Sequence, residues 1–149
     1  MSRMTAVVGL LSVALSLAGC GGMGSANLRD ANGHLAFCNG GPNCVSSESL
    51  NPDRYIAPIA YNGSREAAQA AMVKIISGMQ GAKIVTAEPD YIHAEFAGSI
   101  IHSTYDLELV FPEQKDIQVR ASGRDGYYDG GANRNRVEAI RKAFAAIQP

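Results

Sequence analysis

The sequence predicts an α+β fold of two layers, in which two helices pack on one face of a small antiparallel sheet of about four strands. Residues 64–80 and 133–147 carry apolar side chains at helical spacing, and four short segments between them have the composition and turns of strands. The chain has 149 residues, 46% of them hydrophobic, which suits one domain around one core.

Both helices carry local signals besides their periodicity. Ser64 is a suitable N-cap, Glu66 lies in the first turn, and Gly78 and Gly81 end the first helix. Its predicted apolar stripe consists of Ala68, Met72, Ile75, Ile76 and Met79. The predicted stripe of the second helix consists of Val137, Ile140, Phe144 and Ile147.

The four strands are expected at residues 82–87, 91–96, 105–111 and 117–122. The last two form a hairpin, and the alternation of apolar and polar residues sets its register. Pairing the apolar residues places Leu109 opposite Val119 on the face toward the helices. Glu108 then lies opposite Arg120 on the other face, where a cross-strand charge pair is favourable without any functional role.

The first nineteen residues have the composition of a secretory signal peptide. One basic residue, Arg3, precedes an apolar run over residues 6–18, which is shorter than the roughly 20 residues that a membrane-spanning helix needs. The segment Leu17-Ala18-Gly19-Cys20 resembles the bacterial lipobox, which implies removal of residues 1–19 and acylation of Cys20. The alternative is a buried N-terminal helix with an incidental cysteine.

The lipobox resemblance predicts an exported protein that is anchored in the bacterial cell envelope and faces the periplasm. Gly21 stands where Asp is usual in inner-membrane lipoproteins, and this favours the outer membrane. Residues 20–36 lack periodicity and are rich in Gly, Ala and Asn, so we expect a flexible tether between Cys20 and a single domain at residues 37–149. A net charge of −1 gives no electrostatic reason to expect nucleic acid as a partner.

With Cys20 assigned to lipid, Cys38 and Cys44 remain, and an exported location predicts a disulfide between them. A metal site and a catalytic Cys44 are the two alternatives to this disulfide. The three histidines, His34, His93 and His102, are scattered singly, so neither a metal nor another cofactor is expected. The loop that holds Ser46, Ser47 and Ser49 lacks a nucleophile-elbow pattern, so it predicts no hydrolase.

Residues 120–136 concentrate charge around several glycines. The candidate ligand-binding residues of this segment are Arg120, Arg124, Asp125, Asp129, Asn133, Arg134 and Arg136. One interpretation is internal: the acidic residues and Asn133 cap the last helix, and the arginines hold the loop to the sheet. The other is a site for a phosphate or carboxylate. Tyr127 and Tyr128, if exposed together, could stack on a sugar or base, but one buried and one half-buried side chain is the commoner arrangement and is the one that we expect.

Several segments resemble the domain of unknown function 1499 family. They are Pro42-Asn43-Cys44-Val45-Ser46-Ser47, Pro58-Ile59, Tyr91-Ile92-His93-Ala94-Glu95, Val119-Arg120, Arg124-Asp125-Gly126-Tyr127-Tyr128-Asp129 and Asn133-Arg134-Asn135-Arg136-Val137-Glu138-Ala139-Ile140-Arg141. The family usually has Arg-Ser-x-Ser-Arg where this chain has Arg120-Ala121-Ser122-Gly123-Arg124, and paired aspartates where it has Tyr105-Asp106. The resemblance implies an exported or membrane-associated domain and brings no established reaction.

The sequence therefore predicts a non-enzymatic lipoprotein of the cell envelope with a binding, accessory or structural role. Its expected partners are the membrane, through the lipid anchor, and an envelope protein or an anionic small molecule. The alternative function is a small-molecule binding domain that uses the C-terminal arginines. A third interpretation is an enzyme, with Asp125 or Asp129 as acid or base or Cys44 as nucleophile.

Overall fold

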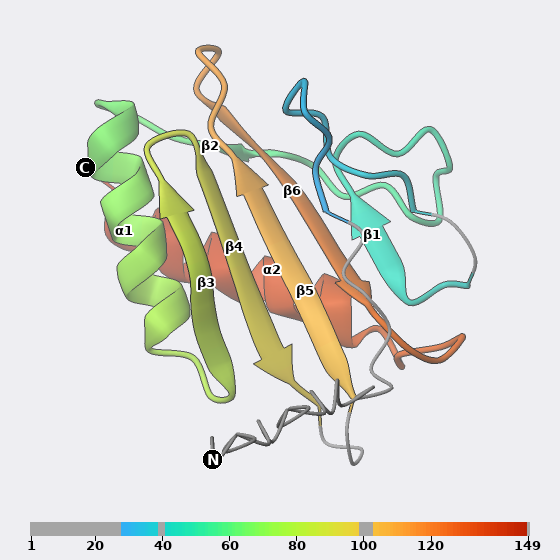
Figure 1. The fold of residues 1–149 in the computed structure, drawn as a ribbon. Helices are drawn as coiled ribbons and strands as arrows, with labels where there is room; N and C mark the ends of the chain where they lie inside the picture. The colour runs from blue at the N-terminus through green and yellow to red at the C-terminus, as the bar shows by residue number, and fades with distance from the viewer. Residues whose placement is uncertain (1–27, 39–40, 99–102, 149) are drawn as a thin grey trace, which may run out of the picture.

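The structure is a computed structural model, and it describes residues 28–38, 41–98 and 103–148. Its elements in chain order are β1 (Cys44–Ser46), β2 (Ile59–Ala60), α1 (Arg65–Ser77), β3 (Ala82–Glu88), β4 (Tyr91–Ala97), β5 (Thr104–Val110), β6 (Asp116–Gly123) and α2 (Ala132–Ala145). Figure 1 shows these strands as one curved sheet. None of the helices among the described residues has the length and apolar character that a membrane crossing requires.

The sheet is antiparallel, with the strand order β1-β6-β5-β4-β3, and β2 also pairs with β6. The predicted α+β class is confirmed, but the sheet has six strands where the sequence indicates about four. The two additional strands, β1 and β2, are three and two residues long. They are too short to show an alternating pattern. They form because their backbone groups pair with those at the free edge of β6.

The predicted hairpin of β5 and β6 has the expected register. Leu109 pairs with Val119, and Glu108 pairs with Arg120. β4 continues the ladder on the other side of β5, with Glu95 opposite Asp106. One register shift interrupts β3 between Ile84 and Thr86. The register decides which side chains share a face, and it therefore determines the composition of the site described below.

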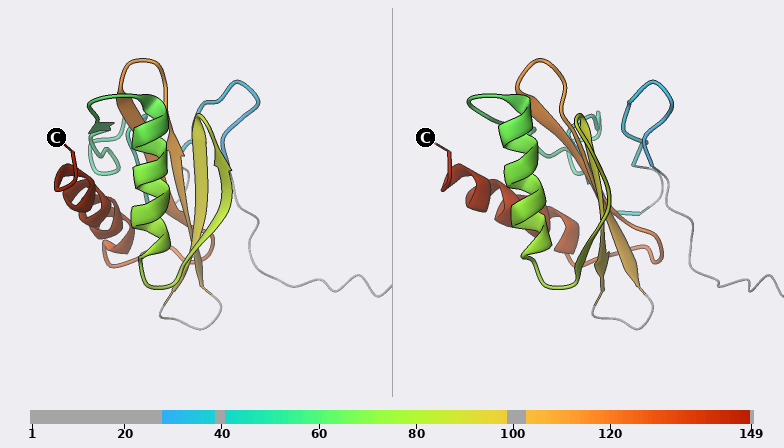
Figure 2. Two further views of the ribbon diagram at one scale, coloured as in Figure 1. Left: turned by 90° about the vertical axis from the view of Figure 1, so that its left-hand side faces the viewer. Right: turned by 60° about the vertical axis from the view of Figure 1, so that its left-hand side comes forward.

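The helices begin close to where the sequence places them. Ser64 caps α1, because its hydroxyl accepts a hydrogen bond from the backbone N–H of Ala67 at 3.2 Å. Gly78 follows the helix as its C-cap. α2 ends at Ala145, so Ile147 lies beyond the helix and is 57% exposed instead of belonging to the buried stripe. Both helices lie on the same side of the sheet (Figure 2).

The hydrophobic core fills the space between the sheet and the two helices. It includes Met72 and Ile76 of α1, Leu109 of β5, and Ile140 and Phe144 of α2, each at most 2% exposed. Along β5 and β6, the apolar residues of the core alternate with polar residues, whose side chains point to the opposite face of the sheet. The second face is therefore the polar one.

Residues 28–38 form a turn on the side of the sheet opposite the helices (Figure 2), and this segment is called the strap. Leu35 of the strap is only 4% exposed, and the strap ends at the disulfide between Cys38 and Cys44. Of the predicted tether at residues 20–36, the structure describes residues 28–36, in which Arg29 bonds Glu108 and Leu35 is buried. The signal peptide, Cys20 and residues 21–27 lie outside the described residues.

Candidate functional site

The four arginines of the charged C-terminal segment lie on opposite sides of the sheet. Arg120, in β6, and Arg124, just after it, point to the face that the strap covers, where their guanidinium groups bind carboxylates of β4 and β5. Arg134 and Arg136 belong to α2, on the opposite side. A single small anion therefore does not contact all four arginines at once.

The face of the sheet opposite the helices carries two groups of buried ion pairs and is called the ionic face. Its first group is built around Glu108, which is fully buried on β5. Its Oε1 accepts hydrogen bonds from the Tyr91 hydroxyl at 2.7 Å and from the backbone N–H of Arg29 at 2.8 Å. Its Oε2 accepts from Arg120 at 3.1 Å. Burial, followed by the bond to Glu108, raises the pKa of Tyr91 far above its usual range. Arg120 keeps one buried N–H, at Nε, that has no partner among the residues the structure describes.

The second group of the ionic face is built around Asp106. Arg124 donates to Asp106 Oδ2 from Nε and to Oδ1 from Nη2, both at 2.8 Å, and it also donates to Glu95. His93 Nε2 lies 2.7 Å from Asp106 Oδ1. Burial alone would raise the pKa of Asp106, but the bonds from Arg124 and His93 outweigh burial and lower that pKa to about 2. Asp106 is therefore ionised, and His93 donates the proton that they share.

His93, Glu95 and Asp106 also present ligand atoms within 4.8 Å of one another, which is the spacing of a small metal site. The positive charge at this place is supplied by Arg124, which bonds both carboxylates. A divalent cation there would face that guanidinium at close range, so the donor set fits an internal ion-pair network better than a metal. The sequence did not identify this cluster, although the alternation along β4 and the pairing of Glu95 with Asp106 were available as signals.

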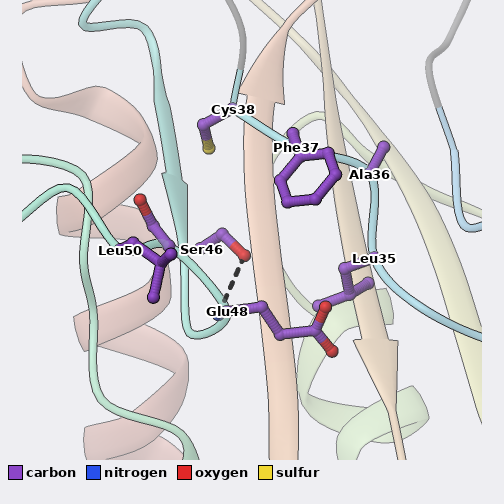
Figure 3. Close-up of a pocket in the computed structure, with 8 residues that line it drawn as sticks. Leu35, Ala36, Phe37, Cys38, Ser46, Glu48 and Leu50 are labelled. Carbon is purple, nitrogen blue, oxygen red and sulfur yellow. Dashed lines mark hydrogen bonds between the residues drawn. The ribbon is translucent and has the colours of Figure 1, made fainter.

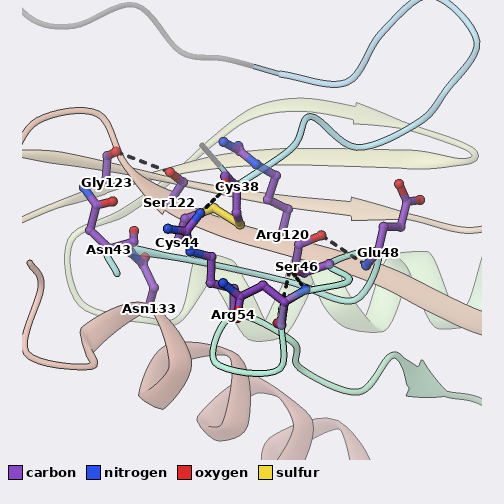
Figure 4. Close-up of a disulfide and its surroundings, with 12 residues drawn as sticks. Cys38, Asn43, Cys44, Ser46, Glu48, Arg54, Arg120, Ser122, Gly123 and Asn133 are labelled. Carbon is purple, nitrogen blue, oxygen red and sulfur yellow. Dashed lines mark hydrogen bonds between the residues drawn. A yellow bond between two sulfur atoms is a disulfide. The ribbon is translucent and has the colours of Figure 1, made fainter. Parts of the chain in front are cut away.

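The strap is attached to the rest of the domain near both of its ends. At its start, Arg29 binds Glu88 at 2.5 Å, and its guanidinium lies 3.7 Å from the centre of the Tyr91 ring. At its end, the predicted disulfide joins Cys38 to Cys44 with 5.5 Å between the Cα atoms (Figure 4). The carbonyl of Cys38 accepts a hydrogen bond from Arg54. The disulfide also removes the free thiol that a catalytic Cys44 would need.

On the helix side, the internal interpretation of the motif describes most contacts. Asp129 accepts hydrogen bonds from the backbone N–H groups of Gly131 and Asn133, both at 2.9 Å, and so caps α2. Asn133 does not cap the helix as expected. It lies inside α2, fully buried, and donates to the carbonyl of Asn43 at 2.7 Å. Asp125 is exposed on the loop before Asp129, and its backbone carbonyl accepts a hydrogen bond from the Asn43 side chain at 3.5 Å.

The two helix arginines are held by oxygen atoms that carry no formal charge. Arg136 donates to Asn133 Oδ1 at 2.7 Å, and its guanidinium lies 4.5 Å from the centre of the Phe96 ring. Burial lowers the pKa of Arg136. Arg134 donates to the carbonyl of Asp53 at 3.0 Å. No carboxylate within the described residues forms a salt bridge with either guanidinium.

The loop between β6 and α2 places both tyrosines in solvent. Tyr127 is 75% exposed and Tyr128 is 73% exposed, whereas the sequence led us to expect one of them to be buried. The backbone below them is firmly held, because Asn43 donates to the carbonyl of Gly126 at 2.7 Å. Gly41 lies so close that a Cβ atom there would be 2.1 Å from the carbonyl oxygen of Tyr127. The loop is thus a fixed backbone that carries two exposed aromatic side chains.

Comparison with known proteins gives a family but no characterised relative. Neither the curated proteins nor the solved structures contain a match to this chain. The model of the family described as protein of unknown function (DUF1499) matches residues 34–144. This range begins within the strap and includes every described element, from β1 to nearly the end of α2. Because it covers well over half of the sequence, the chain belongs to the DUF1499 family.

Proposed function

We propose that this protein is a non-enzymatic lipoprotein of the bacterial cell envelope, anchored through Cys20, with a domain that binds an envelope component. The lipobox supports the anchor, and the disulfide between Cys38 and Cys44 supports an oxidising, extracytoplasmic location. The strap begins at Leu28, eight positions after Cys20. The domain would therefore be held close to the membrane surface on the periplasmic side, with the outer membrane favoured.

The observation that carries the binding role is the exposure of Tyr127 and Tyr128 on a fixed loop. Tyrosine rings offer a large amphipathic surface at a low cost in conformational entropy, and they are enriched in protein interfaces. A loop whose backbone is already held loses little further freedom when a partner binds. We therefore place the binding surface at this loop and take an envelope protein as the partner.

A non-enzymatic role is favoured because the reactive groups of the domain are already engaged. Asp129 caps α2, and Cys44 is in the disulfide. Arg124 binds the carboxylates beside His93. An anionic ligand bound by all four arginines is not part of the proposal, because the sheet separates Arg120 and Arg124 from the other two.

The anchor is tested with Cys20→Ser in the native host. The wild-type protein should be found in the membrane fraction, and the mass of its mature N-terminus should include the acyl chains. The variant should lose both properties. As a matched control, the double variant Cys38→Ser with Cys44→Ser removes the other two cysteines and should remain anchored. A Cys20→Ser protein that stays in the membrane fraction to the wild-type extent would contradict the lipoprotein assignment.

The binding surface is tested by placing a photo-crosslinking amino acid at Tyr128 in cells. We expect a discrete adduct, which excess wild-type protein competes away and the double variant Tyr127→Ser with Tyr128→Ser does not. The control position is Glu113, which is exposed in the loop between β5 and β6, at the opposite end of β6. Equal adducts at both positions, or none at Tyr128, would refute the binding role of this loop.

A further inference from the structure

The surface formed by the strap and the loop after β1 contains the most exposed large apolar side chains of the described residues. Leu50 is 99% exposed and Phe37 is 77% exposed. Both line one hollow, at opposite sides of Ser46, with Glu48 below (Figure 3). Exposed apolar side chains that gather at one place usually mark a contact with a membrane or a partner.

This hollow shares Leu35, Ala36, Phe37 and Glu48 with the lining of a larger groove beside the strap. The groove has a volume of about 600 Å³, and its apolar lining includes Leu28, Leu35 and Phe37. Leu28 and Phe37 belong to the two ends of the strap, which come together because the backbone turns between Asp30 and His34. Leu28, eight positions after Cys20 in the sequence, therefore lies in the lining of the groove.

The length of the intervening chain places this groove at the membrane. Only residues 21–27 separate Cys20 from Leu28. Eight residue steps span at most about 29 Å when fully extended. A lipid on Cys20 would therefore keep the groove within that distance of the bilayer surface, whereas the helices lie on the far side of the sheet.

The charges at the groove restrict the kind of lipid surface. Asp30 and Glu48 line it together with His34 and the apolar residues. The backbone N–H of His34 donates to the Asp30 carboxylate at 3.0 Å and lowers the pKa of Asp30, which keeps that group ionised. Two carboxylates beside apolar side chains complement the ammonium group and the acyl chains of a zwitterionic phospholipid, and they repel an anionic one.

We propose that Leu28, Phe37 and Leu50 insert into the surface of a zwitterionic bilayer, with Asp30 and Glu48 against the ammonium groups of its lipids. The proposal rests on the lipid anchor of the proposed function, which brings the surfaces together. In this arrangement the strap face lies on the membrane. The Tyr127–Tyr128 loop, at the end of the sheet, then remains free for a partner.

The test uses the absence of tryptophan from the sequence. Phe37→Trp and Leu50→Trp each introduce a single reporter at an exposed position. Ile147→Trp, on the helix side and 57% exposed, is the matched control. Each mature chain, beginning at Cys20, is coupled through the Cys20 thiol to a maleimide phospholipid in phosphatidylcholine vesicles. The disulfide protects the other two cysteines, so coupling is confined to Cys20 and does not depend on lipidation in cells.

We expect the emission of the tryptophans at positions 37 and 50 to shift to shorter wavelength and to be quenched by brominated acyl chains, while the control stays unchanged. Without coupling, Phe37→Ser and Leu50→Ser should each weaken partition of the mature Cys20→Ser chain into these vesicles by about tenfold or more. Phosphatidylglycerol vesicles should bind more weakly, and Asp30→Asn with Glu48→Gln should remove this difference.

An unchanged emission at positions 37 and 50 would overturn the proposal, and so would an equal shift at position 147 or stronger binding to phosphatidylglycerol. Failure of the lipoprotein assignment is separate, because it appears as a missing acyl mass in cells while the coupled chain still reports on the groove.

Discussion

On the face that α1 and α2 cover, β4, β5 and β6 contribute only apolar side chains to the core, such as Ile92, Leu109 and Val119. On the other face the same strands contribute His93, Asp106, Glu108 and Arg120, which are also less than 5% exposed. One sheet thus buries residues on both faces, with packed hydrocarbon on one side and hydrogen-bonded ion pairs on the other, where the strap contacts Glu108 and Tyr91.

Substitutions on the two faces should destabilise the fold for different physical reasons. Apolar burial is non-directional and stabilises roughly in proportion to area, so a lost methyl group costs a limited amount. A buried ion pair must offset the desolvation of both charges, so the loss of one partner leaves a charge with nothing to balance it. The ionic face also depends on its cover, because water at Glu108 or Asp106 would weaken each bond. Matched substitutions on the two faces should distinguish the loss of apolar packing from the loss of a charge partner.

We expect the largest effect from Glu108→Ala. The substitution leaves Arg120 buried at 4% exposure without a carboxylate and also removes the acceptor of Tyr91 and of the Arg29 backbone. The free energy of unfolding, measured by urea denaturation, should fall by about 3–5 kcal/mol.

The double variant Glu108→Met with Arg120→Met is the control for Glu108→Ala, because it removes both charges and keeps side-chain volume. It should recover most of the loss. A double variant as unstable as the single one would show that the network is needed for more than the balance of charge.

The matched change on the apolar face is Leu109→Ala. Leu109 is fully buried next to Glu108 in the same strand, so position and strand are controlled. The cavity should reduce the free energy of unfolding by about 2–5 kcal/mol. This loss should be the same in low and high salt, because the substitution changes no charged group. A salt-dependent loss would contradict the separation of the two faces.

The pH dependence of stability should arise on the ionic face. The folded-state pKa of Asp106 is about 2, below the value of about 3.9 for an unfolded chain. A lowered pKa stabilises the fold above the unfolded-state value, and this contribution is lost as the pH falls from about 5 to 2. It amounts to about 2.5 kcal/mol. Asp106→Asn should be less stable than wild type at pH 6, and the difference should nearly vanish at pH 2. A constant difference across this range would exclude Asp106 as the source.

The apolar face could be predicted from the sequence, and the ionic face only in part. The register that joins Leu109 to Val119 follows from the alternation within one hairpin, and the same register placed Glu108 opposite Arg120. Such pairings are local, because a short turn leaves few alternatives. Two strands of two and three residues carry no such pattern, and this is why β1 and β2 were missed.

The strap and the division of the arginines needed information that no local pattern contains. Arg29 reaches Glu108 across 79 positions of sequence, and its segment has the Gly-, Ala- and Asn-rich composition of a linker. The four arginines are neighbours in the sequence, but β6 ends between Arg120 and Arg124 and the chain then crosses to α2. Because the four arginines are close in the sequence, they suggest a single binding site. In the structure they lie on opposite sides of the sheet.

The smallest effect should come from the disulfide, and its location matters more than its size. Replacing both Cys38 and Cys44 with Ser opens a short loop, and the chain-entropy model gives a loss of about 2 kcal/mol. The strap is then held only at its Arg29 end, so hydrogen exchange should rise in residues 29–37 and around Glu108 more than in α1 and α2. Equal exchange on both faces would mean that the strap is not an independent cover. Exchange unchanged in the strap would mean that Arg29 and Leu35 hold it without the covalent bond.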